Sequence, residues 1–236
     1  MRIDGPVPHG GADEKGDGVE RESGVRAVIF DMDGVLVDSE CAYRSCVSEY
    51  FEKLGYPLTD DELDVMAGAS VAKSYDLLSG WWERATGEWR FGGDIDREIY
   101  EQAGQVDYAA IMFEGVPETI AGLSERGYRL AIASSSPRDV IDHVLEACGI
   151  SGYFELVTSG ADFEESKPNP AIYLHTLDAL GLSAEECRVV EDSDYGITAA
   201  VQAGIIVIAR REERFGFSQK GATYFIDAFS GLLDLL

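Results

Sequence analysis

The sequence is poor in basic residues, and this shortage already excludes several kinds of partner. Its 236 residues include 19 lysines and arginines against 44 aspartates and glutamates, which gives a formal net charge of −25. A surface this acidic repels phosphate backbones and anionic lipids, so we expect neither nucleic-acid nor membrane binding. The same reasoning argues against a small anionic substrate, unless particular residues offset the charge locally.

Cysteine and long apolar segments are also scarce. The four cysteines (Cys41, Cys46, Cys148 and Cys187) form no C-x-x-C pair, and four are few for a disulfide-stabilised chain of this length. We therefore expect reduced, buried thiols and a cytoplasmic location. No apolar run approaches the roughly 20 residues of a membrane-spanning helix. Residues 1–24 hold six glycines and nine charged residues, which predicts a disordered leader without a secretory signal.

Beyond the leader, short β-branched runs alternate with amphipathic stretches of about a dozen residues. This pattern is typical of parallel βαβ units and predicts an α/β fold with a doubly wound sheet. The predicted strands are 25–30, 128–133, 154–158, 188–190, 205–209 and 222–226. The predicted helices between them are 117–126, 138–148, 170–180 and 195–203, and a short helix closes the chain.

One block of the chain carries helical patterns alone. Helices are predicted at 40–54, 60–66, 70–79, 81–90 and 94–105, with no strand between them. We therefore expect a helical cap domain at 40–112, inserted into an α/β core domain of residues 25–39 and 113–236. All three tryptophans (Trp81, Trp82 and Trp89) lie in this block, and we expect them to form its core.

Polar residues follow four of the predicted strands, where ligands bind in open α/β sheets. They are Asp31 and Asp33, the run Ser134 to Ser136, Lys167, and the pair Glu191 and Asp192. Taken singly, each could be a turn or a helix cap. Taken together, they suit phosphoryl transfer through an aspartyl-phosphate, because a carboxylate attacks phosphorus once Mg²⁺ offsets the charge repulsion.

Each of these residues has a place in that chemistry. Asp31 is the predicted nucleophile, and Asp31 and Asp192 supply oxygens for Mg²⁺. Lys167 and the Ser134 hydroxyl are expected to hold the phosphoryl oxygens. Asp33 is the predicted general acid, and then the general base for water. Distant surface charges are screened beyond about 8–10 Å, so the net charge does not exclude a small phosphate ester. The acidic cluster at the site is instead part of the reason to expect a metal.

Four segments, each after a predicted strand, resemble the four signatures of the haloacid dehalogenase-like superfamily. They read DMDGVLVDS at 31–39, IASSS at 132–136, ESKPNP at 165–170 and VEDSDYG at 190–196. Their order and spacing resemble the helical-cap branch that contains β-phosphoglucomutase and related sugar-phosphate phosphatases. The resemblance implies Mg²⁺ as cofactor, with the Asp33 backbone carbonyl as a further ligand and Glu191 in the outer shell. It also implies phosphate contacts from Gly34 and Ser135.

The resemblance leaves more than one reaction open. An acidic residue at Asp33 favours phosphate esters over carbon–halogen or phosphonate substrates. A mutase of the branch carries a cap arginine after a G-x-S segment, whereas GAS at 68–70 is followed here by Val71. It also has a cap histidine where this chain has Tyr43. We therefore favour a phosphatase of small phosphorylated metabolites such as sugar or polyol phosphates. A phosphosugar mutase is the alternative, and a non-catalytic binding module is the second alternative.

Three further expectations concern single residues and assembly. Tyr43 and Arg44 follow the predicted junction between core and cap closely, so we expect them to reach the substrate. Asp194 is interpreted as a first-turn carboxylate favoured by the helix dipole, or else as an outer-shell metal partner. With no long heptad pattern, we expect a monomer or a weak dimer.

Overall fold

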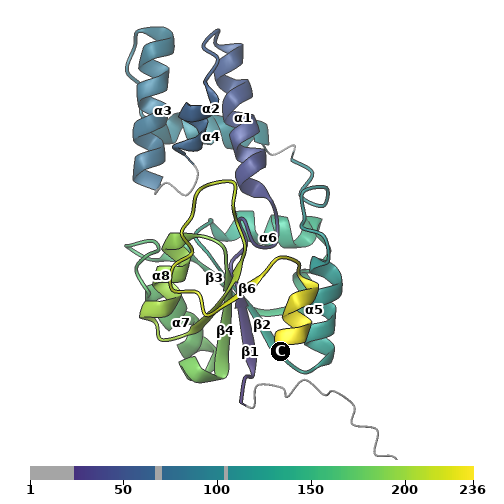
Figure 1. The fold of residues 1–236 in the computed structure, drawn as a ribbon. Helices are drawn as coiled ribbons and strands as arrows, with labels where there is room; N and C mark the ends of the chain where they lie inside the picture. Colours follow the sequence, from purple (N-terminus) through teal and green to yellow (C-terminus); the bar gives the residue numbers. More distant parts are fainter. Residues whose placement is uncertain (1–23, 67–70, 104–105) are drawn as a thin grey trace, which may run out of the picture.

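The computed structural model describes residues 24–66, 71–103 and 106–236. The expected leader, apart from Gly24, and the GAS segment at 68–70 lie outside the described residues. Six parallel strands form one sheet in the order β3-β2-β1-β4-β5-β6 (Figure 1). Their bounds are β1 (Ala27–Phe30), β2 (Arg129–Ser134), β3 (Phe154–Ser159), β4 (Cys187–Glu191), β5 (Ile206–Arg210) and β6 (Tyr224–Ile226). The predicted doubly wound parallel sheet is confirmed.

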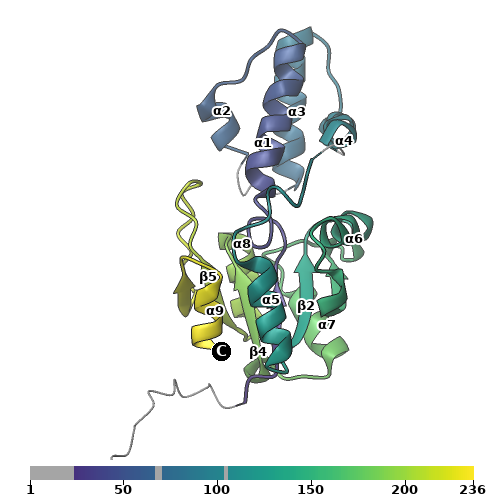
Figure 2. The same cartoon turned by 90° about the vertical axis from the view of Figure 1, so that its right-hand side faces the viewer.

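Helices cover both faces of this sheet (Figure 2). One face packs against α5 (Val116–Glu125), α6 (Arg138–Ala147) and α9 (Ser230–Leu235), and the other against α7 (Ala171–Leu180) and α8 (Asp194–Gln202). Alternate residues of β1 serve the two layers: Val28 and Phe30 point to the first, Ala27 and Ile29 to the second. All four are fully buried, as expected for a central parallel strand. The fully buried strand β1 thus fixes the position of the loop at its carboxyl end.

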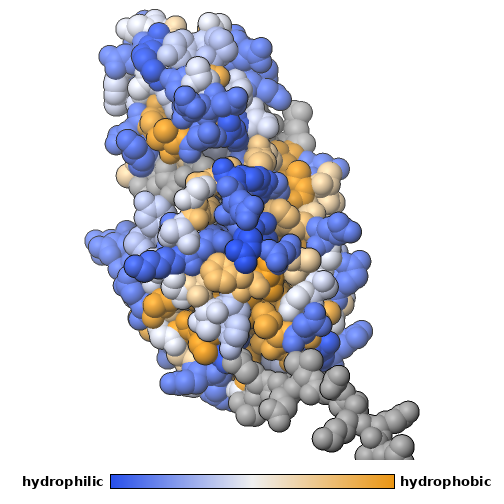
Figure 3. Space-filling view, in the orientation of Figure 1, coloured by the Kyte–Doolittle hydropathy of each residue, from blue (hydrophilic) through white to orange (hydrophobic). Residues whose placement is uncertain are grey.

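The helical cap consists of α1 (Ser39–Lys53), α2 (Asp60–Asp64), α3 (Val71–Thr86) and α4 (Gly92–Ala103). It stands beyond the carboxyl ends of the strands (Figure 1). Its helices share a separate apolar core that includes Val47, Phe51 and Leu78. In the space-filling view, the outer surface over these helices is mostly hydrophilic (Figure 3), in keeping with the excess of acidic residues.

Two predictions for the cap are wrong. The helices expected at 70–79 and 81–90 are the single helix α3. Leu78 and Trp81, on either side of Gly80, are both buried in the cap core and hold the helix continuous, while Gly80 itself faces open space. Trp89 is 69% exposed, whereas Trp81 is 2% exposed and Trp82 packs against the cap core. Trp89 follows the end of α3, so the expectation that an aromatic residue on a helix packs in the core does not apply to it.

Short segments complete the path of the chain. Within the described residues, short 3-10 turns precede or follow strands of the core: η1 (Ser151–Tyr153), η2 (Gly160–Asp162) and η3 (Ala184–Glu186). Two connections join cap and core and hydrogen-bond to each other, with Asp38 N donating to Ile111 O (2.8 Å) and Phe113 N to Leu36 O (3.0 Å).

All four cysteines are free thiols. In the described part of the chain, every helix is too short or too polar to cross a bilayer.

Candidate active site

Lys167 lies at the centre of a buried polar cluster at the carboxyl ends of β1 and β4. Its Nζ donates to Asp31 Oδ1 and to Glu191 Oε1, both at 2.7 Å, and to the Ala133 carbonyl oxygen at 3.0 Å. Its side chain is 6% exposed. Asp31 follows β1, Glu191 ends β4, and Lys167 lies in the loop after β3 and η2. The structure therefore brings together three residues that lie up to 160 positions apart in the sequence.

Three buried carboxylates share this cluster with a single ammonium group. Oxygens of Asp31, Glu191 and Asp192 all lie within 4.8 Å of one another. Burial raises the pKa of Asp31 to about 8, although Lys167 lowers it. Burial also raises the pKa of Asp192 well above its usual range, and the neighbouring carboxylates of Glu191 and Asp31 add to this effect. An all-oxygen site with excess negative charge fits a hard divalent cation such as Mg²⁺.

The Glu191 carboxylate is fully engaged within the protein. Its Oε1 accepts hydrogen bonds from Lys167 and from the Tyr173 hydroxyl, which lies at 3.1 Å. Its Oε2 accepts from the backbone N–H groups of Asp192 and Ser193 and from the Ser193 hydroxyl, at 3.0 to 3.1 Å. Glu191 thus fixes the chain around Asp192, while Asp31 and Asp192 are better placed to bind a cation directly. This arrangement favours the outer-shell role expected for Glu191, which stays a prediction.

Gly196 allows this carboxylate to lie against α8. A Cβ atom at position 196 would lie 1.6 Å from Glu191 Oε1, and the Gly196 N–H donates to Ser193 Oγ. We expect Gly196→Ala to displace Glu191 and destabilise the protein by about 1–3 kcal/mol or more, the range seen for overpacking. Urea denaturation would measure the change. Gly80→Ala is the matched control, because that helical glycine faces open space and the change should stabilise by up to about 1 kcal/mol. Equal stability of the Gly196 variant and the parent would contradict the idea that the Glu191 carboxylate needs a glycine at this position.

Asp33 is held by three hydroxyl groups. Ser39 Oγ donates to its Oδ1 at 2.7 Å, while Ser136 Oγ (2.8 Å) and Ser134 Oγ (3.3 Å) donate to its Oδ2. Ser134 is fully buried beneath Asp33, whereas Ser135 lines the cavity described below. The predicted phosphate contact of Ser134 thus stays a prediction, and the structure gives this hydroxyl a partner in Asp33. The sequence placed Ser136 in the serine run at this strand end but gave it no separate role.

A cavity of about 980 Å³ opens between this cluster and the helical cap. Its floor includes Asp31, Asp33, Ser135, Lys167, Glu191 and Asp192, and its cap side includes Glu40, Tyr43, Val71, Tyr75, Asp96, Arg97 and Tyr100. Tyr43 lines the cavity, where its hydroxyl donates to Asp96 and its ring stacks on Tyr100 with 5.4 Å between the ring centres. Its expected contact with the substrate stays a prediction. The expectation for Arg44 is wrong, because its guanidinium pairs with Asp60 and Asp64 on the cap surface.

Gly34 does not line the cavity, yet its backbone shapes the site. Its φ of +76° lies in the left-handed region, which favours glycine. A Cβ atom there would lie 2.2 Å from Asp192 Oδ2, so only glycine lets the two loops approach this closely. Its expected phosphate contact stays a prediction.

Asp194 has a role that the sequence did not indicate. Its carboxylate accepts hydrogen bonds from Ser218 N and Oγ, both at 3.0 Å, and from Gln219 N at 2.6 Å. The side chain therefore holds the segment after β5 and does not join the carboxylate cluster of Asp31, Glu191 and Asp192. The partners lie some 25 positions away, beyond the reach of local pattern reasoning.

Comparisons with known proteins agree on one family. A family model described as haloacid dehalogenase-like hydrolase matches residues 28–210. The phosphorylated carbohydrates phosphatase of Thermotoga maritima is 31% identical over 183 residues, which cover 77% of this chain and 82% of that protein. The chloroplastic protein SUPPRESSOR OF QUENCHING 1 of Arabidopsis thaliana is 33% identical over 192 residues, 78% of this chain but only 18% of that protein's length. The crystal structure of a candidate β-phosphoglucomutase from Thermotoga maritima superposes with a TM-score of 0.76 at 26% identity, over 90% of this chain and 100% of that one.

Proposed function

Since this chain belongs to the haloacid dehalogenase-like hydrolase family and is a phosphoric monoester hydrolase, we propose that it hydrolyses phosphorylated sugars or polyols with the help of Mg²⁺. The observation that carries the proposal is the contact of Lys167 with both Asp31 and Glu191 at the floor of the cavity. A nucleophilic carboxylate and a fixed positive charge meet there, in a buried site open toward the cap. The same relatives support the proposal, because the Thermotoga protein is named for its action on phosphorylated carbohydrates.

In the proposed mechanism, an Asp31 oxygen attacks the phosphorus atom of the substrate. The bond between phosphorus and the leaving-group oxygen breaks, and Asp33 gives that oxygen a proton. Lys167 holds positive charge beside the phosphoryl oxygens as negative charge gathers on them. Asp33 then takes a proton from water, and the water oxygen attacks the phosphorus atom of the aspartyl-phosphate. The bond between phosphorus and the Asp31 oxygen breaks, which releases inorganic phosphate and restores the Asp31 carboxylate. Asp31, Asp192 and the Asp33 carbonyl would hold Mg²⁺, which supplies charge neutralisation between the carboxylates and the phosphoryl group.

The charges on the cavity wall support a leaving group without a second anion. Within the described residues, the basic side chains that line it are Lys167, Arg97 and His143. Lys167 is engaged by two carboxylates, and Arg97 pairs with Asp94 at 3.3 Å while 69% of its side chain is exposed. Acidic side chains surround the rest of the cavity: Glu40, Asp96, Asp139 and Glu164. An anionic leaving group would meet like charges there, whereas hydroxyl groups can bond to the carboxylates and tyrosines.

The same wall disfavours a mutase. A bisphosphate must be held at both ends, which needs a second cationic site for phosphate. Val71 stands where a mutase of this branch carries its cap arginine, and it lines the cavity with an apolar side chain. The segments outside the description within the cap, 67–70 and 104–105, carry no charged residue that could replace the arginine.

Phosphate release from a panel of esters tests the proposal. With Mg²⁺ present, we expect kcat/KM for hexitol and pentitol phosphates to exceed that for 2-phosphoglycolate by at least about tenfold, equivalent to about 1.4 kcal/mol of discrimination. EDTA should abolish release, and added Mg²⁺ should restore it. A preference for 2-phosphoglycolate would contradict the substrate assignment. Isomerisation of a sugar phosphate without release would favour the mutase, and complete inactivity toward the panel and p-nitrophenyl phosphate would favour the non-catalytic alternative.

A further inference from the structure

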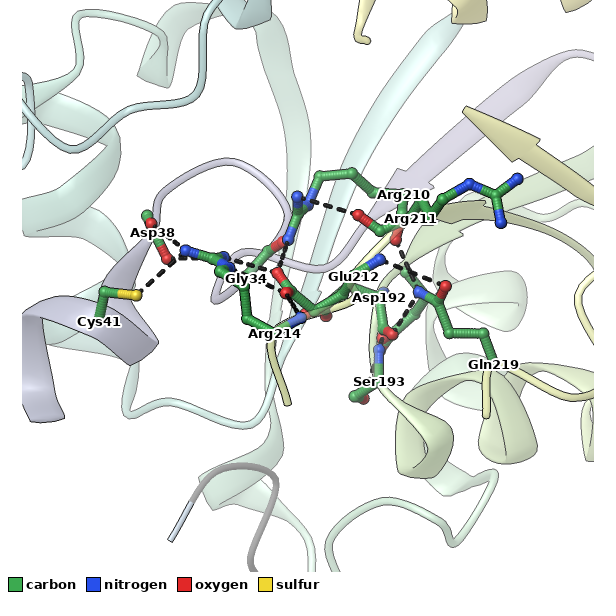
Figure 4. A network of polar contacts seen from close by, with 11 residues as sticks. Gly34, Asp38, Cys41, Asp192, Ser193, Arg210, Arg211, Glu212, Arg214 and Gln219 are labelled. Carbon is green, nitrogen blue, oxygen red and sulfur yellow. Dashed lines mark hydrogen bonds and ion pairs between the residues drawn. The ribbon is translucent and has the colours of Figure 1, made fainter. Parts of the chain in front are cut away.

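The segment from Arg210, the last residue of β5, to Lys220 lies next to both the catalytic loops and the cap. The match to the family model ends at residue 210, so almost all of this segment lies beyond it. In Figure 1 the connection from β5 to β6 rises from the sheet toward the start of α1. Its side chains form a polar network that reaches Gly34, Asp38 and Asp192 (Figure 4).

Glu212 is the centre of this network and is only 4% exposed. Its Oε1 accepts hydrogen bonds from Arg214 N and Nε at 2.8 and 2.9 Å. Its Oε2 accepts from Arg214 Nη2 at 2.6 Å and from Arg210 Nη2 at 2.7 Å. Although burial raises the pKa of Glu212, the hydrogen bonds from Arg214 and Arg210 lower it to about 2. The carboxylate therefore stays ionised at neutral pH and holds both arginines.

The two arginines extend in different directions. Arg210 Nε donates to the Gly34 carbonyl oxygen in the loop that carries Asp31, and its guanidinium lies 4.1 Å from the centre of the Phe113 ring. Arg214 forms a bidentate pair with Asp38, at 2.7 and 3.1 Å, immediately before α1. One cluster thus touches the nucleophile loop and both chain connections between core and cap.

Gln219 ties the same cluster to the second catalytic loop. Its Nε2 donates to the carbonyl oxygens of Asp192 and Arg210, both at 2.7 Å, and its Oε1 accepts from Glu212 N at 3.3 Å. Gln219 is 4% exposed and has a φ of +47°. The network therefore contacts both the loop that carries Asp31 and Asp33 and the loop that carries Asp192.

We propose that Glu212 is a positioning residue that fixes the first helix of the cap relative to the Asp31 loop by holding Arg210 and Arg214 together. This inference rests on the proposed function. Arg210 bonds to the Gly34 carbonyl and Arg214 to the Asp38 carboxylate, so Glu212 is the group that joins these two side-chain contacts. Substrates that contact the cap should depend on this cluster more than substrates that need only the phosphoryl site.

The test compares a polyol phosphate with p-nitrophenyl phosphate, a small ester with an activated leaving group. In Glu212→Gln and Arg214→Gln we expect kcat/KM for the polyol phosphate to fall by about tenfold or more, the scale of a lost charge-assisted interaction. The loss for p-nitrophenyl phosphate should be several-fold smaller. Arg211→Gln is the matched control, since Arg211 lies within the same segment but pairs with Asp227 at 2.8 Å and should leave the ratio of the two unchanged.

Hydrogen exchange of the full chain adds a readout that needs no turnover. We expect faster amide exchange at residues 36–42 in both variants and in Asp38→Asn, but not in Arg211→Gln. The Arg214 and Asp38 changes should be non-additive in a double-mutant cycle. Equal loss of both substrates together with unchanged exchange would overturn the proposal. If the parent protein released no phosphate, the proposed function would fail, while the exchange comparison would still decide whether Glu212 positions α1.

Discussion

Asp31→Asn is expected to abolish phosphate release while leaving the fold intact. The amide keeps the shape of the side chain but is a poor nucleophile and a weaker metal ligand. Removal of a covalent nucleophile costs on the order of 10⁶-fold in other hydrolases, so we expect a loss of at least about 10⁴-fold here. The assay is Mg²⁺-dependent release of phosphate from p-nitrophenyl phosphate, for which the cap contributes little.

Charge arguments predict that this variant is not destabilised. Burial raises the pKa of Asp31 to about 8, above the value of an unfolded chain, so its ionised form opposes folding at neutral pH when no cation is bound. The amide removes that cost, and Lys167 keeps its pair with Glu191. Without Mg²⁺ the variant should therefore melt at or above the temperature of the parent, and added Mg²⁺ should raise its Tm less.

A matched carboxylate controls for a general change in cavity charge. Asp139 also lines the cavity but is exposed and lies outside the Lys167 cluster. Asp139→Asn should retain activity within a few-fold. If Asp31→Asn kept more than about a hundredth of the parent activity, Asp31 could not be the nucleophile, because no other group would replace a covalent step so efficiently.

The sequence predicted which strand ends would meet, because parallel strands of one sheet place their carboxyl ends along one edge. Asp31, Lys167 and Asp192 lie together for this reason, although 161 positions separate the first from the last. The helical cap was also predictable, since its residues show helical periodicity without a strand. The expected boundary between two helices at Gly80 was wrong. A glycine lowers the stability of a helix but does not end it where the neighbouring residues pack well, as Leu78 and Trp81 do here.

Side-chain contacts between residues far apart in the sequence could not be predicted in the same way. Tyr173 occupies an apolar position of α7, and nothing local indicates that its hydroxyl reaches Glu191. Arg214 and Asp38 lie 176 positions apart, and Glu212 joins them to the site through a segment without regular structure. The order of the strands fixes where each strand end lies in the sheet. The partner of a side chain on a long connection depends on the complete fold.

Lys167→Met is expected to impair both stability and catalysis, and the two effects can be separated. The ammonium group is buried, and although burial lowers its pKa, Asp31 and Glu191 raise it well above the usual value. Its removal leaves two buried carboxylates without their cation, which typically costs about 3–5 kcal/mol. It also removes fixed charge beside the phosphoryl oxygens, for which we expect a loss of about 10³-fold or more in kcat.

The double variant Lys167→Met/Glu191→Gln distinguishes these effects. Neutralising Glu191 removes one of the uncompensated charges. With the amide oxygen in the place of Oε2, the hydrogen bonds from Asp192 N, Ser193 N and Ser193 Oγ are kept, and the amide NH2 can donate to the Tyr173 hydroxyl. We therefore expect urea denaturation to show that a large part of the lost free energy of unfolding is regained. Activity should not return, since no cation replaces Lys167 beside the phosphoryl group. Recovery of kcat in the double variant would mean that Lys167 only balances charge, and the proposed stabilisation of the transition state would then have to come from elsewhere in the site.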